Sequence, residues 1–177
     1  YVPEKVEISD QVRDRHYLMA HRHKLSLIDS EYSNEVGWEG NAPRDLWLPR
    51  LDGSLFTAEN GYAGPGVSTG NNVYSIGTYG SWGWLDNLNS QYGYDWEHMT
   101  QEELCSLYTD DLLDPDFKTE AEAIMREKSD AWVTWFEANS PDTEYFVYLI
   151  DESSCYPMIE QWASWIENDP GPGNRLM

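Results

Sequence analysis

Apolar residues recur at helical spacing in four stretches of the chain. These stretches predict helices over residues 12–23, from 101 to about 113, over 118–139, and from Pro157 to the Pro- and Gly-rich stop at 169–173. Thr100 and Glu103 form a capping-box pattern at the start of the second helix. Pro157 suits the first turn of the fourth helix, where its missing N–H costs nothing.

Shorter apolar runs predict strands. Residues 25–28 and 145–150 are almost wholly apolar, which is typical of parallel strands covered on both faces. Residues 73–78 alternate β-branched and aromatic side chains, and residues 175–177 have the character of one more strand opening. Because helices and strands alternate and the two apolar strands end in acidic residues, this order predicts an α/β fold.

The length of the chain limits which α/β architecture it can form. A complete (β/α)8 barrel takes about 250 residues, whereas this chain has 177. We therefore expect a partial or incomplete (β/α)8 TIM-type barrel, formed by a single α/β domain over residues 1–177. The chain starts at Tyr1 and stops within the pattern, which predicts a processed chain or a segment of a larger barrel protein.

Residues 33–98 interrupt the pattern with many glycines and aromatic residues, and we interpret them as a long, ordered insertion. Ordered excursions of this length are usually functional, so a binding surface is expected here. The aromatic side chains expected to pack on sugar rings are Tyr79, Trp82, Trp84, Tyr94 and Trp96. The alternative is that these rings form a small core that folds the insertion onto the domain.

The charge of the chain limits the classes of partner that it can bind. It carries 32 acidic and 11 basic residues, a net charge of −21. Such a charge repels phosphate backbones and anionic membranes, so no nucleic acid is expected as a partner. No apolar run approaches the ~20 residues of a membrane span. An acidic surface with only four lysines is typical of a secreted protein or one adapted to high salt, and we expect an extracellular or cell-surface location.

The sequence indicates neither a metal nor a cofactor. Cys105 and Cys155 form no CxxC pair, and either a disulfide or two buried thiols fits their spacing. The histidines of the first expected helix lack the His-Glu-x-x-His spacing of a zinc site, so we interpret them as solvated or capping residues. The Gly-rich run at 59–66 lacks the Gly-Lys-Ser/Thr ending of a phosphate loop, which argues against nucleotide binding.

Two adjacent carboxylates, Asp151 and Glu152, follow the expected strand at 145–150, at the end where α/β barrels bind ligands. Glycoside hydrolysis needs carboxylates in two roles. Neighbouring residues can fill both when one protonates the leaving oxygen and the other steers a 2-acetamido group that acts as internal nucleophile. The alternative is that Asp151 caps the next helix and Glu152 is a solvated loop acid.

The run Tyr-Leu-Ile-Asp-Glu-Ser at 148–153, followed by Ile-Glu-Gln-Trp-Ala at 159–163, resembles a strand–Asp–Glu–helix segment of the glycoside hydrolase family 123-like barrels. That group includes N-acetyl-β-galactosaminidases that work by substrate assistance. The resemblance implies that Asp151 orients the acetamido group and that Glu152 is the general acid. Residues 12–29 are also similar to a barrel unit of this group.

These patterns together predict a secreted glycoside hydrolase-like domain that cleaves or binds N-acetylhexosamine-containing glycans, with the retaining, substrate-assisted Asp–Glu mechanism. Asp29 and Glu31 are expected at an adjacent strand end, and the aromatic residues of the insertion at the rim. The alternative is a non-catalytic extracellular module that binds carbohydrate or a protein partner. The two differ in whether the acid pair faces an aromatic cleft or the start of a helix.

Overall fold

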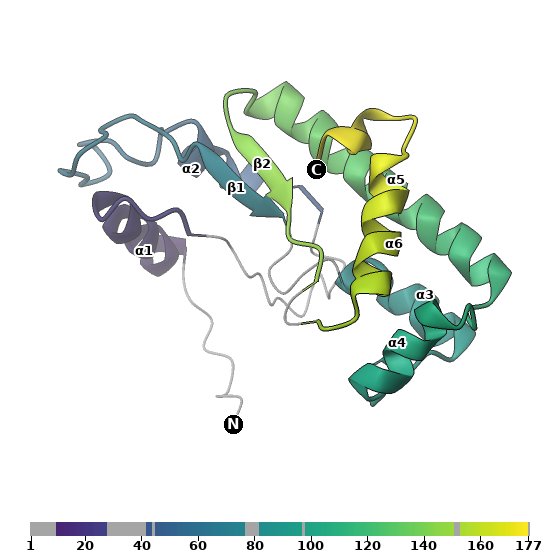
Figure 1. The fold of residues 1–177 in the computed structure, drawn as a ribbon. Helices are drawn as coiled ribbons and strands as arrows, with labels where there is room; N and C mark the ends of the chain where they lie inside the picture. Colours follow the sequence, from purple (N-terminus) through teal and green to yellow (C-terminus); the bar gives the residue numbers. More distant parts are fainter. Residues whose placement is uncertain are drawn as a thin grey trace. The chain divides into compact units, whose positions relative to one another are not determined.

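The structure, a computed structural model, describes residues 10–27, 42–43, 45–76, 82–96, 98–150 and 153–176, with the backbone alone for Leu46 and Trp82. Helices make up 56% of the described residues. The elements in chain order, with η for 3-10 helices, are α1 (Asp10–Arg22), η2 (Asp45–Trp47), α2 (Leu48–Leu51), β1 (Val73–Ile76), η3 (Trp82–Trp84), α3 (Asp86–Tyr92), α4 (Gln101–Thr109), α5 (Pro115–Asn139), β2 (Glu144–Val147), α6 (Tyr156–Glu167) and η4 (Pro172–Leu176) (Figure 1).

The predicted α/β fold, a partial (β/α)8 TIM-type barrel, is wrong. Within the described residues the only sheet has two parallel strands, β1 and β2. Their register follows from the backbone bonds that flank them: Glu144 N donates to Asn72 O at 2.9 Å, and Tyr148 N donates to Ile76 O at 2.8 Å. A barrel needs a series of such strands closing on itself, and the described chain is mainly helical instead.

The barrel prediction is wrong because the apolar runs do not form the buried strands that it requires. Residues 145–150 are predicted to be covered on both faces, yet β2 ends at Val147 and Phe146 is 46% exposed. Leu25 is 58% exposed and lies outside any strand, and the strand predicted to open at 175 is part of η4. Aromatic and β-branched residues favour extended backbone, but such a run does not determine how many partner strands cover it. The strand predicted at 73–78 is present as β1, and residues 77–78 lie outside the described residues.

The four predicted helices are confirmed as α1, α4, α5 and α6. The capping box is present at the start of α4, where Glu103 N donates to Thr100 Oγ1 at 3.2 Å and Thr100 N donates to Glu103 Oε2 at 2.9 Å. These bonds to Thr100 lower the pKa of the Glu103 carboxyl. The helix ends at Thr109, earlier than predicted, and Asp111 has a left-handed backbone with φ of 56°.

The start of α5 differs from the prediction for a specific reason. Asp114 and Pro115 are turn-forming residues, and the sequence pattern places the helix after them. In the structure the Asp114 side chain accepts a bond from Asp116 N at 2.8 Å, and Pro115 takes the first helical position. The same two residue types also start helices, because proline needs no hydrogen-bond partner in the first turn. No helix within the described ranges is long and apolar enough to cross a membrane.

The chain divides into two compact units. Unit 1 comprises Tyr1–Ile28, Arg44–Tyr74 and Asp142–Glu144. Unit 2 comprises Asp29–Pro43, Ser75–Pro141 and Tyr145–Met177. The expected insertion at 33–98 therefore contributes to both units.

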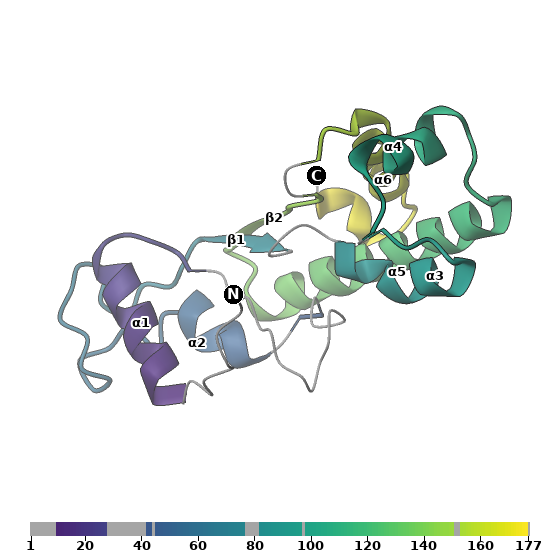
Figure 2. The same cartoon turned by 90° about the horizontal axis from the view of Figure 1, so that it is seen from below.

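Unit 1 is built from α1, α2 and the loop that follows α2 (Figure 2). Its core consists of Tyr17, Leu55, Phe56 and Tyr62, with Leu18 packed against them. The two ends of the loop approach closely: at Gly53, where φ is +85°, a Cβ would lie 2.6 Å from Ser68 O. The loop therefore closes on itself around its own aromatic side chains, as Ω-loops do.

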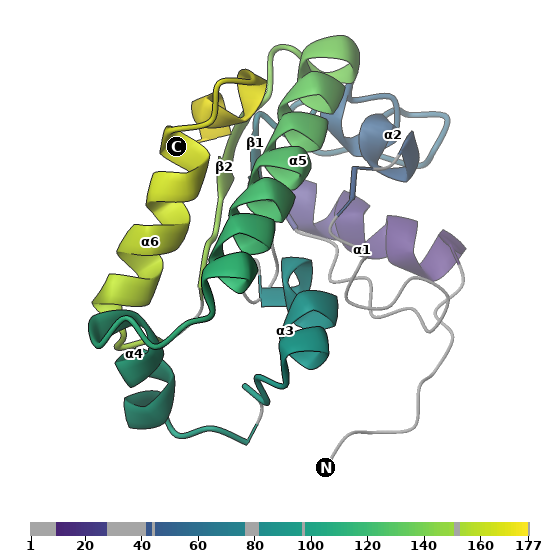
Figure 3. The same cartoon turned by 90° about the vertical axis from the view of Figure 1, so that its right-hand side faces the viewer.

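Unit 2 is organised around α5, the 25-residue helix that packs against α6, η4 and α3. Figure 3 shows α5 and α6 lying side by side. Their fully buried side chains form the core of the unit: Phe117, Met125, Trp132 and Phe136 from α5, and Met158, Trp162 and Ile166 from α6. A disulfide joins Cys105 on α4 to Cys155 at the start of α6, with 5.2 Å between their Cα atoms. Of the two states that the sequence allows, the structure has the disulfide.

A pair of carboxyl groups lies where η4 packs on α5. Asp169 is 5% exposed, and its Oδ1 accepts a bond from Gly171 N at 2.9 Å. Asp130 Oδ1 accepts from Gly173 N at 2.7 Å. Burial raises the pKa of the Asp130 carboxyl, and so do its hydrogen bond to Asp169 and the negative charge there. The folded protein therefore favours the protonated form of Asp130 more than the unfolded chain does.

This pair predicts that stability falls as the pH rises. The folded protein binds more protons than the unfolded chain between the ordinary Asp pKa of about 3.9 and the raised pKa of Asp130. In that window the free energy of unfolding therefore decreases with pH. Asp130→Asn keeps a donor towards Asp169 without a charge, so we expect it to stabilise the protein by about 1 kcal/mol at neutral pH. Urea unfolding at several pH values would measure this.

The matched control is Asp110→Asn, which removes the same charge from an exposed turn. The whole chain carries a net charge of −21, so any acid removed could relieve general repulsion. Equal stabilisation by both variants would assign the effect to net charge and contradict a specific effect of the raised Asp130 pKa.

Candidate functional site

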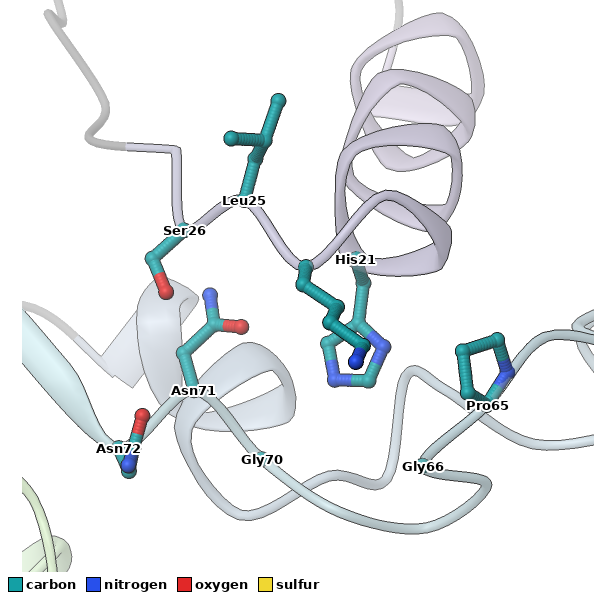
Figure 4. A pocket seen from close by; sticks show the side chains of 9 residues that line it. His21, Leu25, Ser26, Pro65, Gly66, Gly70, Asn71 and Asn72 are labelled. Carbon is teal, nitrogen blue, oxygen red and sulfur yellow. The ribbon is translucent and has the colours of Figure 1, made fainter.

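A polar pocket of about 230 Å³ lies in unit 1, at the C-terminal end of α1 (Figure 4). It is open to solvent. Its lining comes from two segments, the end of α1 with the residues after it and the loop before β1: His21, Lys24, Leu25, Ser26, Pro65, Gly66, Gly70, Asn71 and Asn72. Figure 4 shows the His21 ring extending from α1 towards the pocket and the side chains of Ser26 and Asn71 pointing towards one another.

Backbone geometry at the end of α1 brings these residues together. Lys24 N donates to His21 O at 2.9 Å, and Leu25 N donates to Ala20 O at 3.0 Å. Lys24 itself has a left-handed backbone, with φ of 59°, at the position where helices commonly end in glycine. The chain therefore turns sharply after the helix and carries Lys24 and Ser26 to the pocket that His21 also lines.

The other side of the pocket is held by close approach of the loop to α2. Asn71 N donates to Arg50 O at 2.8 Å. A Cβ at Gly70 would overlap the backbone carbonyl of Leu51, so only glycine fits there. The position of the Asn71 side chain thus depends on backbone contacts made by its neighbours.

His21 is oriented by two contacts. Its ring stacks on Phe56, with 3.6 Å between ring centroids and 20° between planes. Its Nδ1 lies 2.8 Å from Tyr62 Oη, which in turn lies 2.5 Å from Pro65 O. A carbonyl oxygen can only accept, so the Tyr62 hydroxyl donates its proton to Pro65 and must accept from His21. The neutral ring therefore carries its proton on Nδ1 and a lone pair on Nε2.

Gly66 lies close to one edge of this ring. A Cβ at Gly66 would lie 3.1 Å from His21 Cε1 and 3.9 Å from Nε2. Gly66 also has a φ of +75°, a conformation that disfavours other residues. A side chain at position 66 would therefore be in tight contact with His21 Cε1, the ring carbon beside Nε2.

The charge of this region is opposite to that of the chain as a whole. Residues 13–24 hold four of the eleven Lys and Arg residues, three of the four histidines and one of the 32 acids. Among the described side chains that line the pocket, Lys24 and His21 can carry positive charge and none is a carboxylate. A ligand that enters would meet hydrogen-bonding groups and a cation.

Several predicted site residues lie outside the described residues. These are Asp151 and Glu152, predicted as the catalytic pair, and Asp29, Glu31 and Tyr79, predicted to bind substrate. The side chain of Trp82 also lies outside them. Their proposed roles stay predictions.

The other predicted sugar-binding aromatic residues take part in the packing of unit 2. Trp84 is 5% exposed. The Tyr94 ring lies edge-on to Phe117, with 4.9 Å between centroids, and Trp96 stacks on Trp162 at 5.6 Å. Trp84 also lines a cavity of about 180 Å³ between α3 and α5, together with Gly83, Asn87, Leu88, Ile124, Glu127 and Lys128.

The polar pocket is not among the sites predicted from the sequence. Two signals were present: the cluster of cationic residues and histidines at 13–24, and the Gly-Asn-Asn run at 70–72. Neither indicates that the two segments meet, since His21 and Tyr62 are 41 residues apart. The chemistry that the pocket offers is binding through amide, hydroxyl, imidazole and ammonium groups. No family model, curated protein or solved structure matches this chain, so its function is argued from this chemistry.

Proposed function

We propose that this chain is a non-catalytic extracellular binding module and that the polar pocket at the end of α1 takes a carbohydrate ligand. The observation that carries the proposal is the convergence of His21, Ser26 and Asn71 on one open pocket. Amide and hydroxyl groups both donate and accept, which matches the paired donor and acceptor character of sugar hydroxyls. A pocket of about 230 Å³ suits a single monosaccharide unit.

The extracellular location is supported by the disulfide between Cys105 and Cys155. Disulfides persist in oxidising compartments and are rare in the cytosol, apart from the hyperthermophiles. The strong negative charge of the chain would keep such a module soluble.

Binding is favoured over hydrolysis by the lining of this pocket. Substrate-assisted hydrolysis needs a pair of carboxyl groups at the bound sugar. The described residues of the pocket lining include none, and the barrel that would bring Asp151 and Glu152 to a strand end is absent from the same part of the chain. Hydrolysis of N-acetylhexosaminides by that pair is the alternative function.

The test of the binding proposal is a titration with monosaccharides followed by NMR of the backbone amides. Glucose, N-acetylglucosamine, N-acetylgalactosamine and glucuronate would be the probes. We expect at least one of them to shift the amide signals of residues 21–26 and 65–72. Asn71→Ala should weaken that binding roughly tenfold, because one hydrogen bond to the ligand is lost.

Asn139→Ala is the matched control, since Asn139 is an exposed residue on α5 in unit 2. It should bind the sugar as the unchanged protein does. If none of the probes shifts the pocket signals, the carbohydrate proposal fails. Turnover of aryl N-acetylhexosaminides that disappears in Glu152→Gln would establish the hydrolase alternative instead.

A further inference from the structure

We infer that the pocket selects a carboxylate-bearing sugar over a neutral one and that His21 takes up a proton at Nε2 when the carboxylate binds. This inference rests on the proposed binding function and specifies its ligand class and its regulation. It is carried by the His21–Tyr62–Pro65 hydrogen-bond chain and by the positive charge of the pocket lining.

The hydrogen-bond chain determines where a second proton goes. Nδ1 already donates to Tyr62, whose own proton is directed to Pro65 O. Protonation therefore occurs at Nε2, and the ring keeps its orientation because no existing bond has to break. The new N–H lies on the side of the ring that is near Gly66.

Among the described residues, the groups in contact with the His21 ring carry no charge. They are Phe56 and Tyr62, and the two acids of the loop after α2, Asp52 and Glu59, lie outside its stretch from 61 to 72. Lys24, on the same segment as His21, adds a positive charge to the pocket. A protonated His21 would thus sit beside a second cation with no acid among the described residues of the lining, and an arriving carboxylate would stabilise both charges.

Thermodynamic linkage then requires that the ligand binds more tightly as the pH falls. A ligand that favours the protonated ring must itself bind more tightly when the ring is protonated. Histidine changes its charge between about pH 5 and pH 8, so the affinity should rise across that interval as the pH falls. A neutral sugar interacts with both forms through hydrogen bonds alone and should show little of this dependence.

A monoanion fits the pocket better than a phosphate dianion. Among the described side chains that line the pocket, Lys24 is the one ammonium group and His21 the one imidazole. The rest of the chain carries a large negative charge that opposes anions at long range. A carboxylate brings one charge into this opposing field, whereas a phosphate dianion brings two.

The test compares D-glucuronate with D-glucose, which differ in a carboxylate and a hydroxymethyl group, by NMR titration at about pH 7.5 and about pH 5.5. We expect glucuronate to bind about tenfold more tightly at the lower pH and glucose to change little. His21→Gln should remove the pH dependence, and His23→Gln, which does not line the pocket, should keep it. Lys24→Gln should weaken the binding of glucuronate but not that of glucose. Lys118→Gln on α5 is the matched charge control.

A second measurement does not depend on the variants folding. Long-range 1H–15N spectra of the His21 ring should show the proton on Nδ1 in the free protein at about pH 7.5. Added glucuronate should shift the Nε2 signal towards the protonated form at a pH where the free ring is neutral. Equal binding of glucose and glucuronate, or glucuronate binding that does not change with pH, would overturn this inference and leave the proposed binding function intact. Binding of neither sugar at the pocket would count against both.

Discussion

Removal of the disulfide should lower the free energy of unfolding of unit 2 by about 4 kcal/mol. Cys105 and Cys155 are 50 residues apart, so the bond closes a long loop in the unfolded chain and restricts its conformations. The bond also joins α4 to the start of α6, and Cys155 is fully buried. Urea unfolding followed by tryptophan fluorescence would compare the oxidised protein with the Cys105→Ala/Cys155→Ala double variant.

The reducing agent itself provides the control for this experiment. Dithiothreitol should destabilise the unchanged protein about as much as the double substitution does, and it should have no effect on the double variant. If the double variant unfolds at the same urea concentration as the oxidised protein, the disulfide contributes nothing to stability. That outcome would contradict the loop-closure argument.

The helices could be predicted from the sequence because their signals are local. Thr100 and Glu103 lie three residues apart and satisfy each other's backbone groups, so the start of α4 can be recognised without any tertiary information. The signal of Asp114 and Pro115 is equally local, but it is ambiguous, because both residue types are common in turns and at helix starts. The prediction therefore placed the start of α5 three residues too late, at 118 instead of 115.

The sheet could not be predicted in the same way, because the number of strands that meet is a property of the whole chain. The apolar residues of 145–150 favour extended backbone in any fold. Within the described residues β2 pairs with β1 alone, and Phe146 is partly exposed where a barrel would cover it. The alternation of helices and apolar runs is thus compatible with a mainly helical chain as well as with a barrel.

The pocket depends on long-range contacts that no local pattern indicates. His21 acquires its role from Tyr62 and Phe56, which belong to a loop about 40 residues further along the chain. In the sequence, His21 is one of three histidines on a helix, and nothing distinguishes it from His16 or His23. Only the packing of the loop on α1 selects it.

The aromatic residues of the expected insertion show the same dependence on tertiary contacts. Trp96 was predicted to bind sugar, but in the structure its ring stacks on Trp162, with 5.6 Å between centroids and 26° between planes. It also lies edge-on to Phe117. Glycines and aromatic rings in one segment are compatible with a sugar-binding platform and with a small core, and the contacts of Trp96 are those of a core residue.

The last prediction separates these two roles through Trp162, the partner of Trp96. Trp162 is fully buried on α6, and its Nε1 donates to Tyr108 Oη at 3.0 Å. Trp162→Ala should lower the free energy of unfolding by about 3–5 kcal/mol, because a large cavity replaces the indole. Trp162→Phe fills much of that volume and should cost only about 1–2 kcal/mol, mainly for the lost hydrogen bond. Urea unfolding of both variants would measure the difference.

Trp96→Ala extends the same experiment to the predicted sugar-binding residue. A core role predicts that this variant unfolds at lower urea concentration and still binds any monosaccharide that the polar pocket takes. A sugar-binding role predicts the reverse, weaker binding with unchanged stability, since an exposed ring contributes little to folding. Because Trp96 stacks on Trp162, the double variant with Trp162→Ala should lose less stability than the sum of the two single losses. Strict additivity would show that the two rings do not stabilise each other and would contradict the core assignment.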